Sequence, residues 1–332
     1  MLLSIVIPVY NVEAYVERCI RSCAFQDISS SEYEIIAIND GSTDNSLQII
    51  KKLAGEITNL TVYSQKNAGL SAVRNFGFSV SKGDYIWYVD SDDWIAENCL
   101  KRIIEQVKGH QLMAMGYIDA YDDDSNNVIV DFKEKSLIKS GLDLQKLLYS
   151  GFNTPAQLCI VERELLERKG IRFVEGIYHE DVEYTPRVLH GITDVVVLDE
   201  PVYYFYQRPN SITTTVNPKR AFDLAGKINS SLIAFEKTLI DVEEKTVIID
   251  IISENVNKAL DMARHFSGQD IRRLVEILKE NREAYSLMLN SSIRKYRIEG
   301  YMFAHSPRRV ITIYNLLQLV NFNRLRKKKT SR

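Results

Sequence analysis

Long apolar runs are missing from this chain. No stretch reaches about 18 uninterrupted apolar residues, the length that a membrane-spanning helix needs, so we expect no membrane span. The N-terminus also lacks a basic segment followed by an apolar core and a small-residue cleavage site, and Pro8 interrupts its short apolar run, which argues against a signal peptide. With 45% hydrophobic and 26% charged residues, the 332-residue chain has the composition of a globular protein with a substantial core.

Cysteine is scarce and its spacing is not that of a metal or redox site. The four cysteines are Cys19, Cys23, Cys99 and Cys159. Cys19 and Cys23 fit one face of an apolar helix, and we expect all four to be buried free thiols in a reducing cytoplasm. A G-x-G-x-x-G fingerprint is also missing, which argues against a dinucleotide-binding enzyme.

Positive charge is unevenly distributed along the chain. The net charge is -2, yet residues 291–332 hold 11 Lys or Arg against the single acid Glu299. The tail carries an amphipathic pattern from Val310 to Val320, followed by a basic cluster between Arg324 and Lys329. Such a segment is typical of a surface membrane anchor, and equally of a core-packing helix followed by a disordered charged tail.

Strand-like runs alternate with helix-like patterns in the first third of the chain. Short runs rich in β-branched and aromatic residues, typical of buried parallel strands, cover residues 3–9, 33–38, 60–64 and 85–89. Apolar residues at helical spacing cover residues 12–23, 47–53 and 70–80. We expect Asn11 and Ser42 to cap the first two helices. The repeated strand–helix–strand pattern predicts an α/β fold with a doubly wound sheet.

The rest of the chain is less regular and then becomes helical. Residues 111–220 contain an acidic loop around residues 122–127 and several short elements, and we expect this region to bind a second substrate. Residues 221–332 are mainly helical up to the basic tail. The sequence therefore predicts three regions: 1–110, 111–220 and 221–332.

Three carboxylates follow the strand at 85–89. They are Asp90, Asp92 and Asp93. Ligands of open α/β sheets bind outside the carboxyl ends of the strands, and hard oxygen ligands suit Mg²⁺ or Mn²⁺. The cluster thus indicates a metal site, and an Asp-rich turn that caps the next helix explains it equally well.

Polar motifs also follow the first two strands. Pro8 and Tyr10 end the first strand, where Tyr10 could stack on a base, and a turn with a helix cap is an equal alternative. Asp40 ends the second strand and is placed to accept a hydrogen bond from a nucleobase imide, with Gly41 allowing close backbone approach.

Three later segments complete the candidate site. Asn67 begins a motif in which Arg74 could bind a pyrophosphate, hold Asp40, or pair with an acid on the surface. Residues 178–184 place acids beside aromatics and could supply a general base, whereas His179 is more typical of a structural histidine. An aromatic run at 203–206 suggests core packing, and Arg208 and Ser211 after it could close over a diphosphate.

In this order the motifs resemble glycosyltransferase family 2, of the type that builds bacterial surface polysaccharides. The resemblance covers about residues 3–215 and is carried by SIVIPVYN at 4–11, NDGSTD at 39–44, NAGLSAVRN at 67–75 and DSDD at 90–93. It implies the GT-A fold, a mixed and mostly parallel sheet flanked by helices, here with a C-terminal helical extension. It also implies that residues 1–110 bind a nucleotide sugar and that residues 111–220 bind the acceptor.

The resemblance assigns roles to the acids. Asp40 would contact uracil, Asp92 would touch Mn²⁺ or Mg²⁺, and Asp90 would touch the ribose or the donor sugar. Asp181 would be the catalytic base. We place Pro8, Tyr10, Asn67, Arg74, Arg208 and Ser211 in the donor site.

The expected activity is an inverting transfer of one hexose from a UDP-sugar to a saccharide or a lipid-linked acceptor. The Gln-x-x-Arg-Trp signature of processive synthases is absent, which favours a single transfer. Asn39 stands where many relatives carry Asp. Two alternatives are a non-catalytic binding protein of the same fold and a sugar nucleotidyltransferase, which needs an N-terminal triphosphate loop that this chain lacks. We expect no nucleic-acid partner, and peripheral attachment to the inner face of the membrane if the basic tail binds it.

Overall fold

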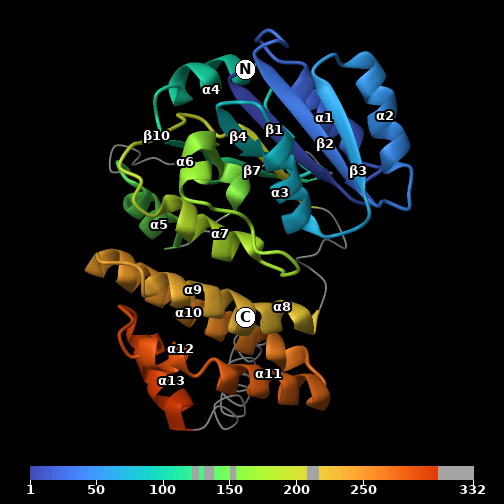
Figure 1. The fold of residues 1–332 in the computed structure, drawn as a ribbon. Helices are drawn as coiled ribbons and strands as arrows, with labels where there is room; N and C mark the ends of the chain where they lie inside the picture. The colour runs from blue at the N-terminus through green and yellow to red at the C-terminus, as the bar shows by residue number, and fades with distance from the viewer. Residues whose placement is uncertain (122–126, 131–137, 150–154, 208–216, 306–332) are drawn as a thin grey trace, which may run out of the picture. The chain divides into compact units, whose positions relative to one another are not determined.

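The computed structural model describes residues 1–121, 127–130, 138–149, 155–207 and 217–305 (Figure 1). The chain forms two compact units. The first contains Met1–Gly176 and Glu180–Thr214, and the second contains Ile177–His179 and Thr215–Arg332. The first unit therefore includes all of the predicted region 1–110 and most of the predicted region 111–220.

A seven-stranded, mostly parallel sheet forms the centre of the first unit. Its order is β10-β6-β9-β4-β1-β2-β3, and β9 alone among these strands is antiparallel to both of its neighbours. The strands are β1 (Leu3–Val9), β2 (Tyr33–Asp40), β3 (Leu60–Gln65), β4 (Tyr85–Tyr88), β6 (Leu112–Ala114), β9 (Cys159–Glu162) and β10 (Val195–Val197). This confirms the predicted mixed, mostly parallel sheet.

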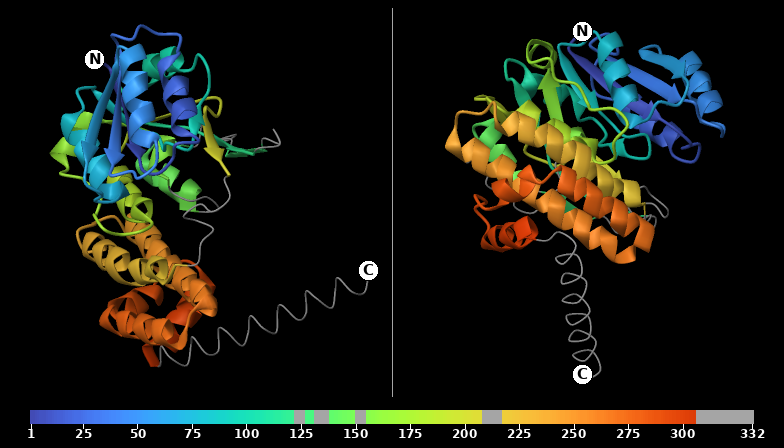
Figure 2. Two further views of the ribbon diagram at one scale, coloured as in Figure 1. Left: turned by 90° about the vertical axis from the view of Figure 1, so that its right-hand side faces the viewer. Right: turned by 60° about the horizontal axis from the view of Figure 1, so that its bottom comes forward.

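Helices cover both faces of this sheet. One face carries α1 (Val16–Ala24), α2 (Ser46–Glu56) and α4 (Leu100–Val107). The other carries α3 (Leu70–Val80), α5 (Gly141–Tyr149), α6 (Arg163–Arg168) and α7 (Glu180–Leu189). Side chains alternate along each strand, so Ile5 and Ile7 of β1 enter the first core while Val6 between them enters the second. Figure 1 shows α3, α6 and α7 in front of the sheet, and Figure 2 shows helices on both of its sides.

A smaller sheet of four strands follows the end of β4. Its order is β5 (Trp94–Ile95), β11 (Tyr203–Tyr206), β7 (Tyr117–Ala120) and β8 (Asn127–Val130). The predicted packing role of the aromatic run is confirmed for Tyr203, which is fully buried. Because β5 begins directly after Asp93, this sheet fixes the turn that carries the three clustered acids.

The second unit is helical, as predicted. Its helices are α8 (Pro218–Asp223), α9 (Asn229–Glu236), α10 (Val242–Met262), α11 (Gly268–Glu280), α12 (Glu283–Met288) and α13 (Arg294–His305), with a π-helical segment at Leu224–Ile228 between α8 and α9 and a 3₁₀ turn at Ala263–His265 after α10. Side chains of Asn217, Asp241 and Ser267 cap α8, α10 and α11. Within the described ranges, no helix is both long and apolar enough to cross a bilayer. The predicted amphipathic and basic segments after residue 310 lie outside the described residues.

The predicted helix caps were wrong. α1 begins at Val16 after Tyr15, and α2 begins at Ser46 after Asn45, so neither Asn11 nor Ser42 occupies a cap position. Asn11 instead accepts a hydrogen bond at Oδ1 from the backbone N–H of Thr43, 2.8 Å away. The polar residues after β1 and β2 therefore bind the two loops to each other, which holds the strand ends side by side.

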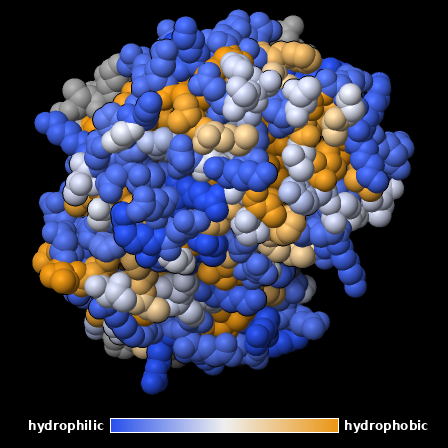
Figure 3. All heavy atoms as spheres, turned by 45° about the horizontal axis from the view of Figure 1, so that its top comes forward, coloured by the Kyte–Doolittle hydropathy of each residue, from blue (hydrophilic) through white to orange (hydrophobic). Residues whose placement is uncertain are grey.

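The predicted state of the cysteines is confirmed. All four are free and buried, and Cys19 and Cys23 lie on the buried face of α1. The outer surface in Figure 3 is largely hydrophilic, with apolar residues in small patches. Both findings fit the globular character expected from the composition.

Candidate active site

Asp40 lies at the end of β2 and is 3% exposed. Its Oδ1 accepts hydrogen bonds from the backbone N–H of Ala68 at 2.9 Å and from Gln65 Nε2 at 2.8 Å, and its Oδ2 accepts one from the N–H of Gly69 at 2.8 Å. Asn67 donates to the Asp40 carbonyl at 3.0 Å. Asp40 thus fixes the loop that leads into α3, the helix that carries Arg74.

Arg74 is the centre of a buried ionic cluster. Its side chain is 0% exposed and pairs through Nη2 with Asp90 at 2.8 Å, and through Nη1 with Glu180 at 2.8 Å and Asp181 at 3.1 Å. Burial by itself lowers the pKa of the guanidinium, and the three carboxylates outweigh this effect, so the pKa is raised overall. The surface-pair interpretation of Arg74 was therefore wrong, because this guanidinium is buried among the acids of two distant motifs.

The end of β4 and the start of α7 meet at this arginine. Asp90 follows β4 and Asp181 lies in the first turn of α7, 91 positions further along the sequence. The second carboxylate oxygen of Asp90 accepts a hydrogen bond from Gln157. Asp90 and Asp181 side chains are 25% and 22% exposed, so both lie at the edge of the packed interior.

The environment of Asp181 raises its pKa to about 8. Burial is the main cause, because it disfavours the charged form, and the negative charges of Glu180 and Asp90 act in the same direction. Arg74 and the backbone N–H of Ala156 lower the pKa and offset part of the effect. A carboxylate with a pKa in this range is a better proton acceptor than an ordinary aspartate.

Asp93 belongs to a different network, on the side of the small sheet. It is 3% exposed, and its oxygens accept hydrogen bonds from the hydroxyl of Tyr203 at 2.8 Å and from the N–H of Tyr206 at 2.8 Å. The Tyr203 hydroxyl also accepts from the N–H of Asp90 at 3.0 Å. Burial raises the pKa of Asp93 well above its usual range, and Asp92 and Asp90 raise it further.

Asp92 lies between these networks in a half-buried position. Its backbone carbonyl accepts a hydrogen bond from Arg18 at 3.0 Å, and that guanidinium lies 3.8 Å from the centre of the Trp94 ring. Across the described parts of the chain, no group of three or more His, Cys, Asp or Glu side chains is arranged to hold a metal ion by itself. A metal at Asp92 would therefore need ligands from a bound substrate or from water.

The other predicted donor-site residues lie around β1 and beyond the described chain. Pro8 is buried in β1, and it is tolerated there because it lies past the last residue of β1 that pairs with β4. Tyr10 follows β1 and is 50% exposed. Arg208 and Ser211 lie outside the described residues.

His179 has a structural environment. It belongs to the second unit, where its Nε2 accepts a hydrogen bond from Arg220 Nε at 3.3 Å. Burial lowers the pKa of His179 to about 4, and the charges of Arg220 and Lys258 add to the effect. A neutral imidazole that accepts from an arginine fits the structural interpretation that the sequence favoured.

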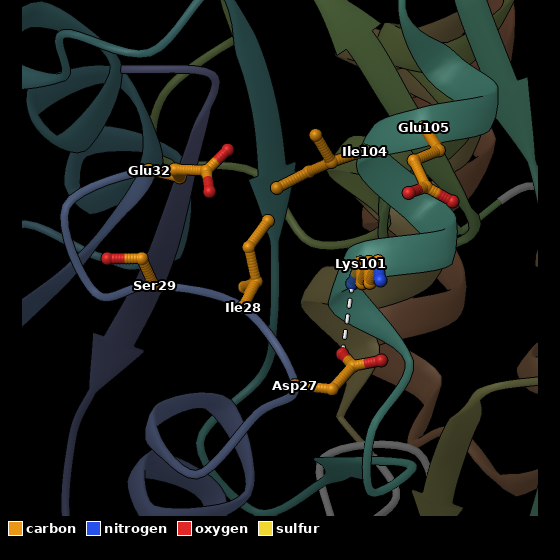
Figure 4. A pocket seen from close by; sticks show the side chains of 7 residues that line it. All are labelled: Asp27, Ile28, Ser29, Glu32, Lys101, Ile104 and Glu105. Atoms are coloured by element: carbon orange, nitrogen blue, oxygen red, sulfur yellow. Dashed lines mark hydrogen bonds between the residues drawn. The ribbon is translucent and has the colours of Figure 1, made fainter.

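A separate cavity of about 240 Å³ lies next to the N-terminal end of α4 (Figure 4). Its lining residues are Asp27, Ile28, Ser29, Glu32, Lys101, Ile104 and Glu105. Asp27 accepts a hydrogen bond from the backbone N–H of Lys101 at 3.0 Å, so this acid already caps α4. None of the predicted site residues lines this cavity.

Sequence reasoning missed three partners of the clustered acids. They are Gln157 beside Asp90, and Tyr203 and Tyr206 beside Asp93. The sequence indicated only packing for the aromatic run, because such a run does not show that the Tyr203 hydroxyl and the Tyr206 N–H donate to Asp93. Gln157 precedes an antiparallel strand inserted into a parallel sheet, and no local motif marks it.

The sequence of this chain matches that of a known protein family. The glycosyl transferase family 2 pattern matches residues 4–169. The uncharacterized glycosyltransferase EpsJ of Bacillus subtilis is 31% identical over 224 residues, which cover 64% of this chain and 63% of EpsJ. The match thus spans just under two thirds of the length of that relative.

Solved structures agree with the fold. The crystal structure of S. aureus TarS 1–349 with UDP-GlcNAc covers 93% of this chain and 92% of its own, with a TM-score of 0.71 and 21% identity. The mannosyltransferase PcManGT of Pyrobaculum calidifontis, in complex with GDP-Man and Mn²⁺, covers 95% of this chain and 86% of its own, with a TM-score of 0.53 and 15% identity. The chain has the GT-A fold and belongs to glycosyl transferase family 2.

Proposed function

We propose that this glycosyltransferase moves one sugar from a UDP-sugar to a hydroxyl of a saccharide or lipid-linked acceptor, with inversion at the anomeric carbon. The observation that carries the proposal is the buried Arg74, which brings Asp90 from the end of β4 together with Asp181 from α7. A donor-binding acid and a proton acceptor must lie close together in such an enzyme, because the two substrates react at one carbon atom.

The proposed donor is a UDP-sugar that binds across the ends of β1, β2 and β4. Asp40 contacts the uracil in this proposal, because its Oδ2 accepts one described hydrogen bond and a carboxylate oxygen can accept more than one. The S. aureus TarS structure with UDP-GlcNAc supports this choice of nucleotide. Pro8, Tyr10, Asn67, Arg208 and Ser211 complete the proposed donor site, and residues 111–220 bind the acceptor.

The residues at the end of β4 fit a divalent cation held jointly with the substrate. The proposed protein ligand is Asp92, which lies half-buried in the turn after β4 at the position that the resemblance to the family assigns to the metal. Mg²⁺ and Mn²⁺ sites of nucleotide enzymes commonly combine one or two carboxylates with substrate phosphates and water. When bound, such a cation neutralises negative charge on the diphosphate leaving group. The complex of PcManGT with Mn²⁺ supports the choice of metal.

Asp181 is the proposed general base. The acceptor hydroxyl attacks the anomeric carbon from the face opposite the diphosphate, and Asp181 removes its proton as the new bond forms. The configuration at the carbon therefore inverts. The raised pKa of about 8 gives this carboxylate a stronger drive to take the proton, and Arg74 fixes its position.

The basic tail is proposed to attach the enzyme to an anionic membrane. Residues 291–332 carry 11 Lys or Arg and one acid, and such clusters are attracted to anionic lipids. We expect that deleting residues 310–332 abolishes sedimentation with anionic liposomes. Sedimentation equal to that of the full chain would contradict this part of the proposal.

The catalytic proposal is tested with Asp92→Ala and Asp181→Ala. We expect both to lose transfer from a UDP-sugar, while only Asp92→Ala greatly weakens UDP binding in Mn²⁺. NMR of the wild-type product is expected to show an anomeric configuration opposite to that of the donor. Unchanged turnover in either variant, or retention of configuration, would contradict the assigned roles.

A further inference from the structure

Gln157 lies opposite Asp90 because of the way β9 enters the sheet. It belongs to a 3₁₀ turn, η2 (Ala156–Leu158), that leads into β9. β9 runs antiparallel to β4 with Trp87 opposite Ile160, so the same register continued for three residues places Gln157 opposite Asp90. The indole N–H of Trp87 donates to the Gln157 carbonyl at 2.8 Å, which fixes the turn in this position.

Arg74 binds both acids of the candidate active site, and this turn binds one of them, Asp90. Asp90 accepts one hydrogen bond from Arg74 and one from Nε2 of Gln157. Asp181 also accepts one from Arg74, and the backbone N–H of Ala156, in the same turn as Gln157, lowers the pKa of Asp181. Arg74 therefore joins the two acids, and the turn fixes the second oxygen of Asp90.

The chemistry of the Gln157 amide indicates a role beyond packing. Its nitrogen must face Asp90, because the amide oxygen would place two acceptors against each other. The Oε1 atom is then buried and accepts no hydrogen bond from the described residues, which costs free energy. A methionine of similar size would fill the same space without this cost, so packing alone does not account for an amide here.

We propose that Gln157 is a positioning residue, which with Arg74 orients the carboxylate of Asp90 toward the nucleotide sugar. The inference rests on the proposed function, because it concerns how Asp90 meets the donor. A change at Gln157 should therefore lower the efficiency with which the enzyme uses the donor and leave acceptor binding unchanged.

The test compares Gln157→Met with a matched control. Gln145 on α5 is buried to a similar degree and also has an unpaired amide atom, but the described residues give it no bond to a site acid. We expect Gln157→Met to lower kcat/KM for the UDP-sugar about 10- to 100-fold. The acceptor KM should equal the wild-type value, and the melting temperature should not fall below it. Gln145→Met should match wild-type activity.

A second variant adds a readout that a structural role would not change. In Gln157→Glu the introduced carboxyl group can donate to Asp90 only when it is protonated. Its kcat/KM relative to wild type is therefore expected to rise as the pH is lowered from about 8 to about 6. A ratio independent of pH would contradict the proposal.

The outcomes separate this inference from the proposed function. If the wild-type enzyme is active and Gln157→Met keeps at least half of its activity, the positioning role alone is overturned. The same holds if Gln145→Met loses as much activity as Gln157→Met. A wild-type enzyme that transfers no sugar from any UDP-, GDP- or dTDP-sugar overturns the proposed function, and this inference with it.

Discussion

Two networks of acids lie on opposite sides of the turn after β4, and they differ in charge and exposure. On one side, Arg74 holds Asp90, Glu180 and Asp181 by ionic bonds, and two of these acids are more than one fifth exposed. On the other side, Asp93 is almost fully buried and its described donors are the neutral hydroxyl of Tyr203 and a backbone N–H. The ionic network is suited to chemistry, and the neutral one to holding the turn in place.

The difference shows how neighbouring acids take separate roles. A buried carboxyl group with neutral donors remains protonated to higher pH, because nothing nearby compensates its charge. A carboxylate bonded to a buried guanidinium ionises more easily than burial alone would allow, and Arg74 in this way offsets part of the raised pKa of Asp181. The predictions below test whether the ionic network carries the activity and the neutral network the local structure.

The largest effect is expected for Arg74→Met. It leaves three acids without their common partner, so we expect loss of transfer and a decrease of about 3–5 kcal/mol in the free energy of unfolding. Urea unfolding at neutral pH measures it. The control is Arg21→Met, because Arg21 also pairs with two acids, Glu17 and Glu56, but on the surface. Equal stability of the two variants would remove the distinction between a buried cluster and a surface pair.

The next effect concerns the pH dependence of catalysis. A base must be deprotonated to act, and the pKa of Asp181 is raised to about 8, so kcat/KM should increase with pH up to about 8 and then level off. Glu180→Gln removes a negative charge that raises this pKa while it keeps an acceptor for Arg74. The rise is therefore expected to move about one pH unit toward acid. A pH–rate profile that is unchanged in the variant would show that the two acids are not coupled.

The smallest effect is expected in the neutral network. Folding raises the pKa of Asp93, so the folded state binds its proton more tightly and wild-type stability decreases as pH rises above the unfolded value of about 4. In Asp93→Asn this loss is absent, and the variant should gain stability relative to wild type as pH increases. Unfolding in urea at several pH values measures the difference.

The exposed Asp84 provides the control for this experiment. Asp84→Asn should show no such gain with pH, because its side chain is not buried. Transfer by Asp93→Asn should remain close to the wild-type rate. A loss of transfer as large as that of Asp181→Ala would contradict the division between the two networks.

Local patterns predicted much of the fold. Residues 3–9 and 70–80 form β1 and α3 with the predicted bounds. A nearly continuous apolar run is typical of a strand buried on both faces, and apolar residues at helical spacing fit a helix packed on the sheet. The caps failed at Asn11 and Ser42, because a polar side chain after one strand can accept from the backbone of the neighbouring loop as well as from a helix. The preference of Asn and Ser for helix caps does not show whether such a residue binds a helix or a neighbouring loop.

The candidate site was only partly predictable for a related reason. Asp90, Asp92 and Asp181 were recognised from their motifs, but the partners of Arg74 on α7 lie 106 and 107 residues away. Gln157 depends on the antiparallel register of β9, which no periodicity reveals. Residue types thus indicated the chemistry, and only the packing of distant segments showed which groups are joined.

The central claim is that the acids gathered at Arg74 form the site of sugar transfer. The most direct measurement is a crystal structure with UDP and Mn²⁺, in which anomalous scattering locates the metal. Our account predicts Mn²⁺ at the carboxylate of Asp92, with the diphosphate beside the metal and Asp181 on the opposite side of the space for the sugar. A nucleotide bound elsewhere, such as in the cavity beside Asp27 and Lys101, would contradict it.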